Sequence, residues 1–333
     1  MKIDFEHRQS AHCESGVTAN LLHHYGIDIS EAMAFGIGAG LFFGYLPFIK
    51  INKLPLTTFR CEVGGIFKRL TRWFGLQVRW QKFRNPEKAM DALDRKIEEG
   101  IPVGCRTGGY WLPYFPPAFR FHFNMHNLVV IGRENDHYII SDPVFPDLER
   151  CHRKDLMKAR FAKGAMAPRG TMYYLTHVPE TVPFDQSVKN GIRIVCRRML
   201  HTPGPLIGVK GIRYLARQVK KWPEKLGQRK ASLYVTQLIR MQEELGTGGG
   251  GFRFMYAAFL QEAAQRLQAP GLQDLSDKMT AAGDLWREFA VIGARNCKGR
   301  AGENDSYAAM TRILMECADR EEEIYRKLLP TVR

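Results

Sequence analysis

The spacing of apolar residues divides the chain into a mixed first half and a helical second half. In the first half, helical patterns such as 86–99 alternate with short strand patterns at 101–106 and 171–176. Beyond about residue 184, apolar residues recur at helical spacing, for example at 205–221 and 307–329. The pattern predicts an α+β domain over residues 1–180, with an antiparallel sheet, followed by a mainly α-helical domain over residues 181–333.

A polar segment that ends in Cys13 precedes the first helical pattern. Gln9 and His12 lead into the cysteine, and an apolar-periodic run then continues to Gly26. We expect a short helix with Cys13 in its first turn. The N-terminus of a helix favours a thiolate, which is the nucleophilic form of cysteine. Gln9, or a backbone N–H near Cys13, can donate to an oxyanion. The alternative is a buried cysteine that acts only as a small apolar residue.

A second polar pair flanks two predicted strands. The first strand begins at His126, and the next one ends at Asp142 after a short turn at 134–137. Because two antiparallel strands joined by a short turn bring the start of the first beside the end of the second, His126 and Asp142 should be neighbours. A carboxylate orients an imidazole and makes it more basic, as a thiol's general base requires. A strand-end histidine and an Asp-Pro turn are also common without any catalytic role.

Composition limits the class of protein. The chain has 333 residues, enough for two domains, and seven cysteines at irregular spacing without a Cys-x-x-Cys pair. This argues against a disulfide framework and against a zinc site. The first residues lack the apolar core of a signal peptide, and no apolar run reaches transmembrane length. We therefore expect a cytoplasmic protein without a membrane span.

The net charge of +15 indicates an anionic partner. The positive charge is spread along the chain, and no zinc-finger or RNA-recognition motif occurs, so we expect no nucleic acid partner. An acidic carrier protein, a phosphate-bearing ligand and an anionic membrane surface would each match the charge. A solvated basic surface is the simplest alternative.

A glycine-rich loop at 246–251 leads directly into a predicted helix. Free N–H groups of Gly249 and Gly250, with Arg253 in the first turn, would form an anion site. The loop lacks the lysine of a P-loop, so nucleotide hydrolysis is excluded as an interpretation. A plain glycine-rich helix junction explains the same residues equally well.

Several segments together resemble the butirosin biosynthesis protein H family. The resemblance rests on the pair His12-Cys13, on Ser30 to Gly38, on Leu112-Pro-Tyr114, on His122 to Gly132 and on Asp142-Pro143. It covers an N-terminal domain of roughly residues 7–145, and the helical segment that begins near the glycine-rich loop resembles the second domain of that family. The resemblance implies a papain-like fold for the first domain.

The resemblance also implies a function. Members of the family are expected to move an acyl group from the phosphopantetheine thioester of an acyl carrier protein to a small amine, so no cofactor is bound by the chain itself. Cys13 would be the nucleophile, His126 the base and Asp142 the orienting carboxylate. The supporting or oxyanion residues would be Gln9 and His12, and the substrate-binding residues Glu31, Tyr110, Tyr114, Asn124, Gly249, Gly250 and Arg253.

Two other functions use the same residues. A hydrolase, whether amidase, peptidase or thioesterase, needs the same Cys-His-Asp triad but admits water to the acyl-enzyme. A binding protein on a retired protease fold would need none of the three. The aromatic loop at 110–117 favours exclusion of water. The sequence leaves the acyl group, the amine and a homo-oligomeric state open.

Overall fold

The computed structural model describes residues 1–51, 53–117, 120, 122–244, 246–300, 302 and 305–332. The chain forms two compact units, each discontinuous in sequence. Unit 1 contains residues 1–34 and 66–183, and unit 2 contains residues 35–65 and 184–333. The predicted fold class, an α+β part with an antiparallel sheet followed by a mainly helical part, is confirmed.

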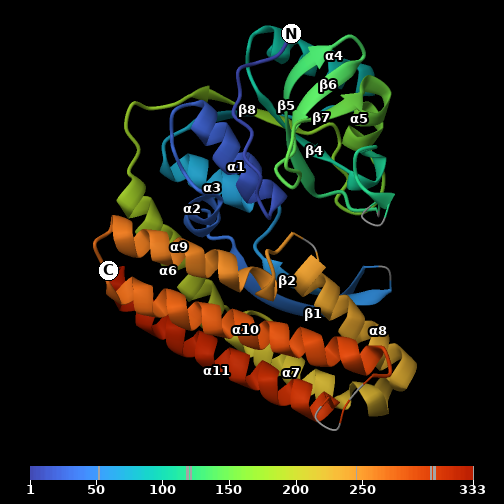
Figure 1. The fold of residues 1–333 in the computed structure, drawn as a ribbon, viewed down its shortest axis with the longest axis vertical. Helices are drawn as coiled ribbons and strands as arrows, with labels where there is room; N and C mark the ends of the chain where they lie inside the picture. The colour runs from blue at the N-terminus through green and yellow to red at the C-terminus, as the bar shows by residue number, and fades with distance from the viewer. Residues whose placement is uncertain are drawn as a thin grey trace. The chain divides into compact units, whose positions relative to one another are not determined.

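Unit 1 is built on a six-stranded sheet with the order β3-β8-β4-β5-β6-β7, in which the paired strands run antiparallel (Figure 1). Most residues of β5 and β6 are buried, as their Val, Ile and Leu content predicts. The strands are β3 (Gln77–Gln81), β4 (Val103–Thr107), β5 (His126–Glu134), β6 (His137–Ser141), β7 (Glu149–His152) and β8 (Met172–His177).

The β5–β6 hairpin has the geometry that its short turn predicts. Glu134 pairs with His137 next to the turn, the register shifts between Gly132 and Val130, and Val129 then pairs with Ser141 at the other end. The start of β5 therefore lies beside the residues that follow β6. This register is the reason that His126 and Asp142 come together.

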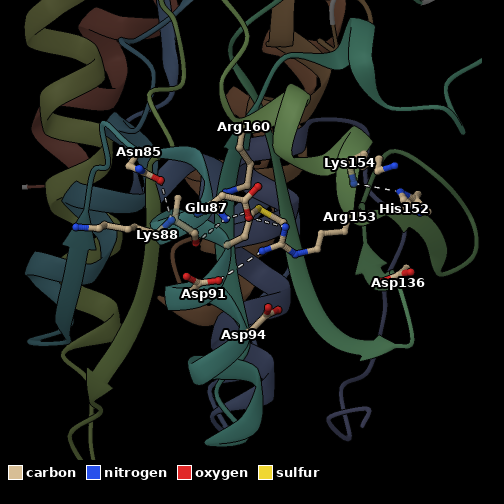
Figure 2. A network of polar contacts seen from close by, with 12 residues as sticks. Asn85, Glu87, Lys88, Asp91, Asp94, Asp136, His152, Arg153, Lys154 and Arg160 are labelled. Atoms are coloured by element: carbon tan, nitrogen blue, oxygen red, sulfur yellow. Dashed lines mark hydrogen bonds and ion pairs between the residues drawn. The ribbon is translucent and has the colours of Figure 1, made fainter.

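Two helices of unit 1 are joined by a basic residue (Figure 2). Arg153 at the start of α5 (Arg153–Arg160) pairs with Glu87 at 2.7 Å and with Asp91 at 3.5 Å, both on α4 (Pro86–Glu98). The fully buried Arg160 donates from its guanidinium to the carbonyl oxygen of Ala89 at 2.9 Å.

Unit 1 also contains the helices α1 (Cys13–His24) and α3 (Gly65–Trp73), the start of α2 (Glu31–Ile37) and the short turn η1 (Gly109–Trp111).

Unit 2 combines a helical bundle with one hairpin. Helices α7, α9, α10 and α11 run side by side (Figure 1), and the hairpin β1 (Leu41–Ile51) with β2 (Leu54–Arg60) packs on the bundle. The fully buried Trp286 contacts the rings of Phe43 and Phe59 from the two strands. The helical segments are α6 (Phe184–His201), α7 (Gly208–Leu226), α8 (Gln228–Ile239), η3 (Arg240–Glu244), η4 (Gly250–Phe252), α9 (Arg253–Arg266), α10 (Gly271–Cys297) and α11 (Tyr307–Thr331).

The β1–β2 hairpin belongs to unit 2, so the observed division of the chain differs from the division predicted from sequence. The division predicted from sequence, 1–180 and 181–333, places residues 35–65 in the first domain, whereas their contacts place them in unit 2. The physical reason is the aromatic packing of Phe43 and Phe59 on Trp286. The later change of unit, after Pro183, lies three residues from the predicted boundary.

Among the helices in the described ranges, none combines the length and the apolar character that a bilayer crossing requires.

Candidate active site

The helix that carries Cys13 begins at a histidine cap. Nδ1 of His12 accepts a hydrogen bond from the backbone N–H of Ser15 at 3.3 Å, which satisfies one donor of the first turn. A side chain at Gly16 would meet Ser10 at 2.6 Å and Pro143 at 2.7 Å, so only glycine permits this approach. The first turn of α1 therefore lies directly against the residue that follows Asp142.

Glu31 holds the loop before Cys13. Its carboxylate accepts hydrogen bonds from the N–H groups of Ala11 at 2.8 Å and His12 at 2.7 Å, and from the Ser15 hydroxyl at 3.1 Å. Burial raises the pKa of Glu31 above its usual value, although these three donors oppose the shift. The carboxylate that the sequence predicts as a substrate ligand is thus engaged within the protein.

Cys13, His126 and Asp142 come together, as the sequence predicts. Nε2 of His126 lies 2.7 Å from Oδ2 of Asp142, and the exposed fractions of the three residues are 7%, 5% and 0%. Because Asp142 occupies Nε2, the other ring nitrogen, Nδ1, remains for the thiol. The hydrogen bond to Asp142, together with the electrostatic influence of Cys13 on the ring, orders the three groups as thiol, imidazole and carboxylate, which is the arrangement of a cysteine nucleophile with an oriented base.

The charges around His126 favour its protonated form. Burial lowers the pKa of His126, but the charge and hydrogen bond of Asp142, together with those of Cys13, outweigh burial and raise it to about 10. An imidazole with these neighbours retains a proton taken from the thiol. The site therefore favours the imidazolium form of His126.

An aromatic loop covers the His126–Asp142 pair. The Tyr114 hydroxyl donates a hydrogen bond to Oδ2 of Asp142 at 2.9 Å. The ring of Phe115 stands edge-on to His126 with 5.1 Å between ring centroids, and it also packs on Phe145. These contacts shield the pair from water on this side, which strengthens the electrostatic interaction between imidazole and carboxylate.

The raised pKa of His126 predicts a pH-dependent stability. The unfolded histidine titrates near 6.5 and the folded one near 10, so the stabilisation is fully present below pH 6.5 and is lost as the pH rises to 10. The free energy of unfolding should fall by at most about 1.4 kcal/mol per pH unit in this window. Urea unfolding of wild type and His126→Gln between pH 6 and 10 checks this, because His126→Gln should lack that part of the slope. Identical slopes for the two proteins would contradict the assignment.

Three other residues that the sequence predicts for the site have surroundings that do not include Cys13, His126 or Asp142 among the contacts that the structure describes. Gln9 is exposed, and its role as an oxyanion donor stays a prediction. Tyr110 is 39% exposed and stacks on His122 with 4.2 Å between centroids. The Asn124 amide donates to the carbonyl oxygens of Lys163 and Ala165, both at 3.0 Å, and so fixes a loop.

The glycine-rich loop has its donors engaged internally. The N–H of Gly249 donates to the Thr247 hydroxyl at 3.0 Å, and that of Gly250 donates to the Glu243 carboxylate at 3.1 Å. Arg253 is fully buried and pairs with Glu321, with Nε and Nη2 each 2.9 Å from a carboxylate oxygen. The predicted anion site is therefore corrected to a helix junction, because its donors already have partners.

Burial disfavours the thiolate form of several other cysteines. All seven cysteines are free thiols. Burial raises the pKa of Cys105 and Cys317, and it raises the pKa of Cys151 to about 12. A thiol that stays protonated is a poor nucleophile. Within the described ranges, no cluster of three or more His, Cys, Asp and Glu side chains could hold a metal ion.

The sequence interpretation missed one polar neighbour of Cys13. Nδ2 of Asn127 lies 4.0 Å from Sγ of Cys13, and the residue is 1% exposed. The available signal was its position directly after His126, since a polar side chain in the otherwise apolar strand 127–131 needs a buried partner.

Comparisons with known proteins match both parts of the chain. A family model described as butirosin biosynthesis protein H, N-terminal, matches residues 12–143, and one described as a domain of unknown function (DUF4872) matches residues 154–328. Among solved structures, the chain is similar to a C39-like peptidase from Bacillus anthracis, with 15% identity, a TM-score of 0.38, and coverage of 54% of this chain and 100% of that chain. No curated protein sequence matches the chain.

Proposed function

Because the chain belongs to the butirosin biosynthesis protein H-like family, we propose that it is an acyltransferase that moves an acyl group from a carrier-bound thioester to an amine. It would therefore be a cysteine enzyme of papain-like type. The observation that carries the proposal is the buried arrangement of Cys13, His126 and Asp142 within the matched residues 12–143.

The proposed reaction has two half-reactions. His126 takes the proton of the Cys13 thiol, and Sγ attacks the thioester carbonyl. The carbonyl's bond to the carrier sulfur then breaks, the carrier thiol leaves with the proton from His126, and an acyl-enzyme remains. An amine attacks this acyl-enzyme, gives its proton to His126, and displaces the Cys13 sulfur to form an amide. His126 returns the proton to the sulfur, so atoms and charges balance.

The distribution of charge supports an acidic carrier as the donor. The expectation that the positive charge is spread along the chain is corrected for one segment, because residues 184–226 contain ten Lys and Arg residues against two acidic ones, Asp185 and Glu224. These residues form α6 and α7. A basic surface attracts an acidic protein that carries phosphopantetheine, and the attraction weakens as salt increases.

The test is the intact mass of the protein after incubation with acyl-thioesters. Wild type and Cys13→Ala are compared with two donors, an acyl carrier protein thioester and the same acyl group on free pantetheine. Wild type should gain one acyl mass, whereas Cys13→Ala should gain none. Amines should discharge the adduct, and the carrier-bound donor should react faster at low salt than at high salt.

Each outcome separates the candidate functions. An adduct that water discharges as fast as any amine would contradict transfer and identify a hydrolase. The absence of any adduct, together with slow alkylation of Cys13, would contradict enzymatic use of the triad. Equal adduct formation in Cys13→Ala would assign the acylation to another residue and overturn the proposal.

A further inference from the structure

A buried carboxamide faces the sulfur of Cys13 from β5. Nδ2 of Asn127 lies 4.0 Å from Sγ and 3.2 Å from the carbonyl oxygen of Met125. Sγ also lies 4.0 Å from that carbonyl oxygen. One amide hydrogen is thus donated to the carbonyl of the residue that precedes β5, and the second is directed to the sulfur. The sulfur can donate to the carbonyl as a thiol and accept from the amide as a thiolate.

The orientation of the amide is fixed by a tyrosine. The Tyr173 hydroxyl donates to Oδ1 of Asn127 at 3.2 Å. Burial raises the pKa of Tyr173 well above 10, so this hydroxyl keeps its proton. The Met125 carbonyl can only accept. Both partners therefore require the NH₂ end of Asn127 to face Cys13.

The tyrosine itself is held rigidly. Its ring packs on Phe67 and on Trp80, with centroid distances of 4.8 and 4.6 Å. A Cβ on Gly104 of the neighbouring strand β4 would lie 2.3 Å from the ring, so Gly104 leaves the space that the ring fills. Tyr173 is 2% exposed. Since neither the ring nor the amide can rotate freely, the donor is preorganised toward the sulfur.

We propose that Asn127 is a further catalytic residue, whose side-chain N–H donates to the Cys13 thiolate, and that Tyr173 is its positioning residue. The inference rests on the proposed use of Cys13 as the nucleophile. His126 stabilises the thiolate by its charge, and Asn127 adds a neutral donor. Hydrogen bonds to charged groups are the strong ones, and a buried environment strengthens them further.

The test is alkylation of Cys13 by iodoacetamide, located by peptide mass. In this reaction the sulfur bonds to the methylene carbon, iodide leaves, and the thiol proton passes to the base. Asn127→Leu should slow alkylation at pH 7 by about 10- to 100-fold, the effect of a lost hydrogen bond to a charge. At pH 10 the variant should recover, because hydroxide forms the thiolate without help. Tyr173→Phe should show the same pH-dependent loss with a smaller magnitude.

A matched control is Asn20→Leu, which removes another buried amide, on α1, that donates to the carbonyl oxygen of Arg8 instead. This control should alkylate at the wild-type rate. A wild-type rate for Asn127→Leu at pH 7, or an equal loss at pH 7 and pH 10, would overturn the proposal. If Asn127→Leu does not fold, Tyr173→Phe, which loses one oxygen, decides by the same criterion.

The alkylation result is independent of acyl transfer. A wild-type protein that alkylates readily but accepts no acyl group would contradict the proposed function, while the comparison of Asn127→Leu with wild type would still decide the role of Asn127. Normal acyl transfer with no effect of Asn127→Leu would overturn only the role of Asn127.

Discussion

Replacement of His126 by alanine is expected to slow acylation of Cys13 by about 10²- to 10⁴-fold at neutral pH, the range that a positioned general base contributes. The imidazole is the nitrogen base that the structure places between the thiol and Asp142. Without it, the thiol proton has no acceptor of suitable basicity. The rate of p-nitrophenolate release from p-nitrophenyl acetate in the first turnover measures this effect, because the ester acylates the sulfur whatever the natural donor is.

Two controls support the interpretation of the His126→Ala result. His177 is exposed at the end of β8, so His177→Ala should keep the wild-type rate. Added imidazole should restore part of the rate of His126→Ala, because it can enter the space left by the ring and accept the proton. An unchanged rate in His126→Ala would show that His126 is not the base.

In unit 2, replacement of Glu321 by alanine should lower the free energy of unfolding by roughly 3–5 kcal/mol, because it leaves a buried guanidinium without its counter-ion. Glu321 and Arg253 are both fully buried and are paired through two hydrogen bonds of 2.9 Å. The same carboxylate accepts from Nε1 of Trp286 at 2.7 Å and from the Tyr325 hydroxyl at 3.0 Å. The change therefore leaves four hydrogen-bond donors, from three side chains, without this acceptor.

Urea unfolding followed by tryptophan fluorescence measures the loss. A matched control is Glu323→Ala on the same helix, where an exposed carboxylate pairs with Lys278 and Lys327. Exposed pairs contribute about 0–1 kcal/mol, so this variant should stay close to wild type. An equal, small loss in both variants would show that Glu321 is not the centre of a buried polar network.

The sequence predicted those features of the site that depend on local patterns. A helix begins at Cys13, and a hairpin with a short turn brings His126 beside Asp142, because turn length determines strand register. The resemblance to the butirosin biosynthesis protein H family is also confirmed by the matches over residues 12–143 and 154–328. These features were predictable since each depends on neighbours in sequence or on a recognisable motif.

Features that depend on distant contacts were not predictable. Asn127 meets Tyr173 from another strand, and Arg253 meets Glu321 from another helix. A glycine-rich loop before an arginine has the same local pattern whether its donors face solvent or are engaged internally, so periodicity alone could not exclude an anion site. The role of Glu31 was not predictable for the same reason. Its three hydrogen-bond donors come from residues 11–15, which are distant from Glu31 in sequence.

The insertion of residues 35–65 into unit 2 has a consequence for making the enzyme in parts. A fragment that ends at residue 183 would carry the β1–β2 hairpin without α10, and Phe43 and Phe59 would lose their contact with Trp286. Those exposed rings and strand edges would favour aggregation. An autonomous catalytic fragment would therefore need the hairpin to be removed and the chain rejoined across the gap, rather than a simple truncation.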